Sequence, residues 1–143
     1  MQRRGSNGGS SLRRNPLLIS SAVLVFLNAF HGLDHVRQGL GRLTTEVVVG
    51  GQALLLLALL PLALSFRHHR LAPLAAATVG LWTALAVAAS HLAPHWSAFS
   101  DPYADNDLDW FSWGQMLLLI AAAAALGIVG IRALRRNAAA ASS

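Results

Sequence analysis

The sequence contains no cysteine and no lysine, and only 12% of its 143 residues are charged. Without cysteine the chain has no disulfide, no thiolate nucleophile, no cysteine-ligated zinc and no iron–sulfur cluster. Any metal site must therefore use histidine and carboxylate ligands. The apolar content is 55%, whereas a soluble domain of this length needs a far more polar surface.

Four apolar stretches follow one another along the chain, at 16–32, 47–64, 71–92 and 110–131. Each is close to the ~20 residues that a helix needs to cross a bilayer. We therefore expect an all-α protein, a bundle of four transmembrane helices over residues 16–136. The tails at 1–15 and 137–143 are rich in small and polar residues, which predicts that both are disordered.

Arginines and acids lie on opposite sides of these stretches. One side holds nine arginines: Arg3, Arg4, Arg13, Arg14, Arg67, Arg70, Arg132, Arg135 and Arg136. The other side holds Arg37 and Arg42 with all six acids: Asp34, Glu46, Asp101, Asp105, Asp107 and Asp109. The positive-inside rule then predicts a plasma-membrane protein with both termini in the cytoplasm. The sequence pI of about 11.6 indicates contact with anionic lipid head groups, not with nucleic acid.

Small residues recur at helical spacing in the last two stretches. The third stretch carries Ala72, Ala76, Gly80, Ala84 and Ala88, and the fourth carries the alanines at 121–125 with Gly127 and Gly130. Such a row lets another helix approach closely inside a membrane. The pattern leaves open whether the partner helix belongs to the same chain, to a second copy or to a larger membrane complex.

Polar residues of the stretches gather at the ends that the charge pattern places outside. They are Asn28, His31, Asp34, His35, Gln38, Gln52, Ser90, His91, His95 and Gln115. Ionisable groups at membrane depth are costly and usually face a bundle interior or a wet cavity. The sequence therefore predicts a polar pocket that opens outward.

The histidines of this pocket have the spacing of a metal site. His31 and His35 lie at positions i and i+4 of one helix, so both rings project from one face, with Asp34 beside them to ligate or orient a ring. We expect His91 and His95 of the third stretch to complete the ligand set. The accessory candidates are Asp101, Gln52 and Gln115. Nitrogen and oxygen ligands suit zinc or another divalent transition metal; binding a small ligand and handling protons are further roles for the same pocket.

A structural interpretation competes with the metal site. Histidines and aromatic residues are often found at the ends of membrane helices, where they lie among lipid head groups and form an interfacial belt. The positions of Trp96, Tyr103, Trp110 and Trp113 are consistent with such a belt. Pro94 disfavours helical geometry just before it, so the helix is expected to end between His91 and His95. On this interpretation the protein is a structural or accessory membrane subunit without chemistry of its own.

Other chemistries have weaker support. Haem between the two histidine groups is one, and calcium bound by the acids at 105–109 is another, although Trp110 stands where a calcium loop needs glycine. Asp107 and Asp109 are better suited to cap the fourth helix. Zinc-assisted hydrolysis needs histidines and aspartates that hold zinc and activate water, and the sequence contains both. A catalytic triad of Ser90, His91 and Asp101 is not supported, because no nucleophile-turn motif surrounds the serine. The sequence does not favour an enzyme.

Three segments carry a resemblance to known proteins: FHGLDHV at 30–36, HLAPHWSAFSDPY at 91–103 and LDWFSW at 108–113. With the exclusive use of arginine over lysine, they resemble small actinobacterial integral membrane proteins of no established function. The resemblance spans most of the chain between the tails. It implies a four-helix membrane fold and brings no substrate or cofactor with it.

Overall fold

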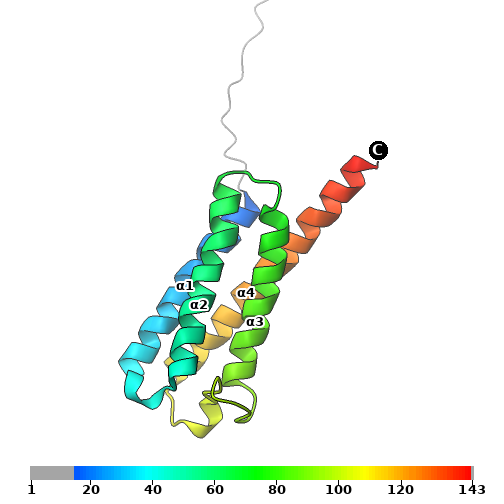
Figure 1. The fold of residues 1–143 in the computed structure, drawn as a ribbon. Coiled ribbons are helices and arrows are strands. Elements are labelled where there is room, and N and C mark those ends of the chain that lie inside the picture. Colours follow the sequence, from blue (N-terminus) through cyan, green and yellow to red (C-terminus); the bar gives the residue numbers. More distant parts are fainter. Residues whose placement is uncertain (1–14, 143) are drawn as a thin grey trace, which may run out of the picture.

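The computed structural model describes residues 15–142, and within this range the chain folds into four long α-helices (Figure 1). They are α1 (Pro16–Gln38), α2 (Thr45–Phe66), α3 (Ala72–His91) and α4 (Trp110–Ala141), with short 3-10 turns η1 (Leu40–Arg42) and η2 (Tyr103–Asp105). Each of the four is long and apolar enough to cross a membrane. The predicted all-α, four-helix fold is confirmed, and it indicates a multi-pass membrane protein. The predicted N-terminal tail and its four arginines lie outside the described residues, apart from Asn15.

The helices run alternately up and down, as expected for neighbours joined by loops (Figure 1). The start of α1 and the turn at 67–71 lie at one end of the bundle, here called the terminal end. The segments 39–44 and 92–109 lie at the opposite, distal end (Figure 1). Both ends of the described chain therefore lie on the same side of the bundle, and α4 extends beyond it.

Local signals set the helix boundaries at the distal end. Gly39 has a φ of 99°, a conformation that favours glycine, and α1 ends just before it. Thr44 begins α2 by accepting a hydrogen bond from the backbone N–H of Val47. Asp109 does the same for α4 through the N–H of Ser112. One of the two predicted capping acids thus fills that role.

Helix α4 is longer than the apolar pattern predicts. It continues through Asn137 and four alanines to Ala141, although residues 137–143 have the composition expected of a disordered tail. Alanine has the highest intrinsic helix propensity, so an established helix propagates readily through the run. The predicted tail is therefore helical from Asn137 to Ala141, and the description of the structure ends at residue 142.

The rows of small residues pack α3 against α4 of the same chain. A Cβ atom added to Gly80 would lie 2.5 Å from the backbone nitrogen of Gly127, and one added to Gly130 would collide with the backbone nitrogen of Ala77. The two backbones are therefore in direct contact, as small residues allow. For Gly80, Gly127 and Gly130, the helix that approaches closely therefore belongs to the same chain.

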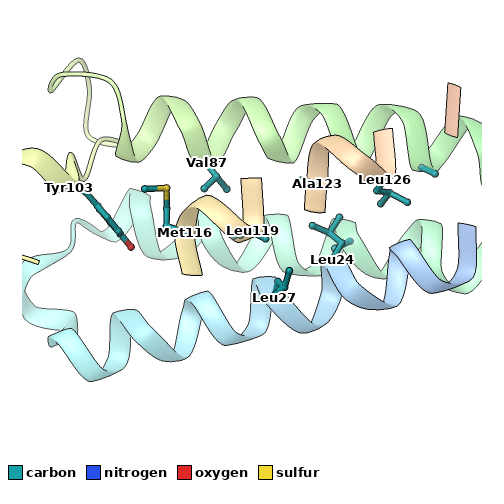
Figure 2. Close-up of a cluster of buried hydrophobic side chains, with 10 residues drawn as sticks. Leu24, Leu27, Val87, Tyr103, Met116, Leu119, Ala123 and Leu126 are labelled. Carbon is teal, nitrogen blue, oxygen red and sulfur yellow. The ribbon is translucent and has the colours of Figure 1, made fainter. Parts of the chain in front are cut away.

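The apolar core lies inside the bundle, with most of its residues on α1, α3 and α4 (Figure 2) and Ala58 contributed by α2. Its labelled members are Leu24 and Leu27 of α1, Val87 of α3, Tyr103 of the distal loop, and Met116, Leu119, Ala123 and Leu126 of α4. Helix α2 packs more loosely, because only 11% of its apolar segment is buried inside the protein, against 50% for α3. It forms the open wall of the bundle.

Replacing Gly80 with alanine should destabilise the protein, because the added methyl group has no room beside the α4 backbone. Overpacking of this kind costs about 1–3 kcal/mol, which lowers the thermal midpoint in detergent. The matched control is Gly32→Ala in α1, where a Cβ meets no described atom within 4 Å; its midpoint should hold or rise, since alanine favours a helix. Equal midpoints for the two variants would contradict the close packing of α3 and α4.

Candidate metal centre

Three buried histidines converge at the distal end of the bundle. The Nε2 atom of His31 lies 3.2 Å from Nε2 of His91 and 3.2 Å from Nε2 of His35. One ligand atom from each side chain lies within 4.8 Å of the others. His31 and His35 share a face of α1 because they are one turn apart. His91 is the last residue of α3 and meets them across the bundle.

The spacing of these nitrogen atoms matches that of ligands on one metal ion. In a tetrahedral zinc site with Zn–N bonds of about 2.0–2.1 Å, two ligand nitrogens are about 3.3 Å apart. The two Nε2 separations at His31 are both 3.2 Å. Two of the three nitrogen pairs therefore already have the spacing that one metal ion requires, and the ligand atoms of all three residues lie within 4.8 Å of one another.

The second ring nitrogens of His31 and His91 face hydrogen-bonding partners, as metal-bound histidines require, whereas Nδ1 of His35 has none among the described residues. Nδ1 of His91 donates to the backbone carbonyl of Asp101 at 3.0 Å, so the neutral ring carries its lone pair on Nε2. Both amide atoms of Gln115 reach Nδ1 of His31, Oε1 at 3.2 Å and Nε2 at 3.0 Å. Oε1 of Gln115 can thus accept a hydrogen bond from Nδ1–H, which leaves the lone pair on Nε2 of His31 to bind metal; in the other tautomer, Nε2 of Gln115 donates a hydrogen bond to Nδ1.

A carboxylate oxygen of Asp101 supplies negative charge beside the cluster. Its Oδ2 atom lies 3.9 Å from Nδ1 of His35 and 3.8 Å from Nδ1 of His91. This oxygen is buried and has no hydrogen-bond partner among the described residues. The predicted accessory residue Asp101 is therefore positioned to stabilise positive charge on the two rings.

Asp34, which the sequence offers as a ligand, lies outside the histidine cluster. Its Oδ1 atom accepts a 2.7 Å hydrogen bond from Arg37, and Oδ2 accepts from Gln38 at 2.6 Å and from Gln115 at 3.1 Å. Both oxygens are thus engaged elsewhere. Asp34 acts on the cluster indirectly, by orienting the amide group of Gln115 that faces His31.

Arg37 links the distal ends of α1 and α4, a role that sequence reasoning missed. Besides Asp34, its guanidinium group donates to both carboxylate oxygens of Asp109, at 3.0 and 3.1 Å, and to Ser112. The N–H of Ser112 and the charge of Arg37 lower the pKa of Asp109. The signal was present in the sequence, because Arg37 is one of only two arginines on the side that carries the acids.

The loop at 92–109 folds over the cluster and delivers two residues to it. The N–H of Asp101 donates to the carbonyl of Ser90 at 2.9 Å, and the hydroxyl of Ser90 donates to Phe99. Tyr103 is 1% exposed, and its ring centroid lies 4.6 Å from that of His91. The prediction that Tyr103 belongs to a lipid-facing belt is wrong, because the loop turns it inward; burial raises the pKa of its phenol.

Several predicted site residues do not join the cluster. Helix α3 ends at His91, as Pro94 predicts, and His95 is exposed in the following loop. Gln52 of α2 is exposed and lines a cavity wall, and it makes no hydrogen bond to the histidines among the described residues. Within residues 15–142, the only group of three or more histidines and acids that could hold a metal is His31, His35 and His91. The acids at 105–109 form no comparable calcium site there.

A cavity of about 940 Å³ reaches the cluster from between α1, α2 and α3. Asn28, His31, His35 and His91 line it together with many apolar side chains of α2 and α3. The loose packing of α2 accounts for this space. The histidine site is therefore accessible to a small molecule as well as to an ion.

No family model matches the chain, and no curated protein or solved structure shows significant similarity to it. The functional argument therefore depends on the geometry of the site.

Replacing Arg37 with glutamine should destabilise the protein, because the Asp34 carboxylate, whose side chain is 1% exposed, loses its charged partner. A buried acceptor without its partner costs about 1–3 kcal/mol, and the thermal midpoint in detergent should fall accordingly. Arg42→Gln is the control, since Arg42 is exposed and bonds to Gln38. The double variant Asp34→Asn, Arg37→Gln should recover part of the lost thermal stability. A thermal midpoint of the double variant below that of Arg37→Gln would argue against the Asp34–Arg37 ion pair as the cause.

Proposed function

We propose that this protein is a membrane metal-binding protein in which His31, His35 and His91 hold a divalent transition metal, with zinc as the best geometric match. The observation that carries the proposal is the 3.2 Å separation of the Nε2 atom of His31 from those of the other two rings. It corresponds to the spacing of nitrogen ligands around one ion. The hydrogen bonds behind the rings of His31 and His91 support the same assignment.

Hydrogen bonding among the rings is a poorer explanation of this geometry. A ring nitrogen carries either one proton or one lone pair in the plane of the ring. Nε2 of His31 faces two other nitrogens at the same distance, so one proton can serve only one of these contacts well. A metal ion accepts all three lone pairs at once. This difference favours a metal site over core histidines that merely bond to one another.

Three histidines leave a fourth coordination position open. Structural zinc sites usually have four protein ligands, whereas sites that bind a small ligand or activate water keep one position for it. His31, His35 and His91 also line the cavity between α1, α2 and α3. The proposed metal therefore serves ligand binding and not the fold alone.

We further propose that the distal end faces the exterior of the plasma membrane and the terminal end faces the cytoplasm. The charge distribution supports this orientation, because the arginines at 67, 70, 132, 135 and 136 belong to the terminal end, where anionic lipid head groups would meet them. The resemblance to actinobacterial membrane proteins and assembly into an oligomer or larger complex remain predictions.

Reporter fusions test the orientation. A fusion after Arg70 should report cytoplasm, and so should one after Ala141, because both positions belong to the terminal end. A fusion after Asp105 should report the exterior. An exterior signal at Arg70 with a cytoplasmic signal at Asp105 would reverse the proposed orientation.

Metal titration tests the proposed site. The chelator-stripped protein in detergent should bind one zinc or cobalt(II) ion per chain, and a metal at a hundredfold excess over its Kd should add about 2.7 kcal/mol of stability. His31→Ala and His91→Ala should abolish both effects. Acidification should release the metal, because protonated imidazole cannot ligate.

The matched controls are His95→Ala and His68→Ala, which lie outside the cluster and should bind metal like the wild type. If zinc, cobalt and nickel all fail to bind or to raise the thermal midpoint of the wild type, the metal proposal is wrong. The structural or accessory role would then be the better account of the histidines.

A further inference from the structure

The cavity beside the histidines has mostly apolar walls and a small group of polar lining residues. Its volume of about 940 Å³ lies within the range of roughly 300–1,000 Å³ that is common for small-molecule sites. The walls include Val47 and Leu54 of α2, Leu85 of α3 and Phe99 of the distal loop. The polar residues of the lining are the three histidines, Asn28, Gln52 and Ser90. A cavity of this kind fits an amphiphile with a long apolar chain and a single polar head.

The walls leave room for such a chain and give access from the bilayer. Gly32 of α1 and Gly51 of α2 line the cavity, and a Cβ at either position would meet no described atom within 4 Å. Trp82 and Leu85 of α3 also line it while remaining 63% and 66% exposed. These residues lie in the apolar part of a membrane-spanning helix. The cavity therefore opens sideways toward lipid.

The charge at the histidine cluster determines the kind of head group. Three neutral imidazoles leave a bound divalent ion with two positive charges, and Asp101 supplies one nearby negative charge. Asp34 is paired with Arg37 and adds little. One uncompensated positive charge in a low-dielectric interior is costly. A head group with a single negative charge that can ligate the metal removes this cost.

Asn28 supplies a second and independent observation. Its side chain is 95% buried, since only 5% is exposed, and its Nδ2 atom has no hydrogen-bond partner among the described residues. It lies one turn before His31 on α1 and lines the same cavity. Buried donors are rarely left without an acceptor. Nδ2 is itself buried, so the amide group must turn toward the cavity for an oxygen atom of the bound head group to provide one.

We propose that the cavity binds a long-chain carboxylate drawn from the bilayer. One carboxylate oxygen occupies the open position on the metal, the other accepts a hydrogen bond from Asn28, and the chain lies along α2 and α3. This inference rests on the proposed metal site. The carboxylate group neutralises the excess positive charge and accepts a hydrogen bond from Asn28, and its apolar chain fills the space between the walls. A hydroxide ion on the metal would leave that space empty.

The experiment uses the full-length protein in a non-ionic detergent, first loaded with cobalt(II), whose visible absorption reports its ligands. Dodecanoate should change this spectrum saturably, with one molecule bound per chain. Dodecanol and methyl dodecanoate have the same chain without the carboxylate and should leave the spectrum unchanged. Acetate should need a concentration at least about tenfold higher, because it lacks the buried chain.

Two variants separate the head-group and chain contacts. Asn28→Leu should weaken dodecanoate binding about tenfold through loss of a hydrogen bond to a charged group. Gly51→Leu should weaken it by filling the cavity. Both should bind one cobalt ion per chain, as the wild type does. The matched control is Gly114→Leu in α4, where a Cβ also meets no described atom within 4 Å and which lies outside the cavity lining; its dodecanoate affinity should be unchanged.

The outcomes distinguish this inference from the metal site. If cobalt binds but dodecanoate leaves its spectrum unchanged, or dodecanol acts equally well, the carboxylate inference is wrong and the metal site stands. If metal-free His31→Ala protein binds dodecanoate as tightly as the cobalt-loaded wild type, the cavity is a general lipid groove and the inference also fails. If no cobalt binds to the wild type, both proposals fail.

Discussion

The direct contact between the backbones of α3 and α4 fixes the geometry on which the rest of the bundle depends. Gly80 faces Gly127, and Gly130 faces Ala77, so neither helix can rotate or shift without collision. Helix α4 in turn packs against α1 through Leu119 and other core residues (Figure 2). The position of α1 relative to α3 follows from these two packings, although the two helices make few direct contacts.

At the distal end, hydrogen bonds and ion pairs between the packed helices hold the three histidines of the candidate site in place. Arg37 joins α1 to the start of α4 through Asp109, and Gln115 of α4 reaches His31 of α1. The 92–109 loop adds Asp101 beside His35 and His91. The histidines therefore sit in a network contributed by α1, α3, α4 and the loop. Such a network holds ring orientations better than apolar packing alone, because hydrogen bonds are directional.

Helix α2 has a different role from the other three. Little of its apolar surface is buried, yet it supplies one wall of the cavity that leads to the histidines. A tightly packed fourth helix would have closed this space. The structure thus combines three closely packed helices, which position the candidate metal ligands, with a fourth helix, α2, whose looser packing leaves those ligands accessible.

The sequence by itself determined the features that are local along the chain. Apolar length gave the four helices, Gly39 and Asp109 marked boundaries, and the spacing of His31 and His35 placed both rings on one face. Only the tertiary structure decided that His91 and not His95 joins them, and that Asp101 and not Asp34 lies beside the rings. These choices depend on how each helix is rotated about its axis and on the path of a loop. Each residue turns a helix by about 100°, so interhelical packing alone selects which side chains meet.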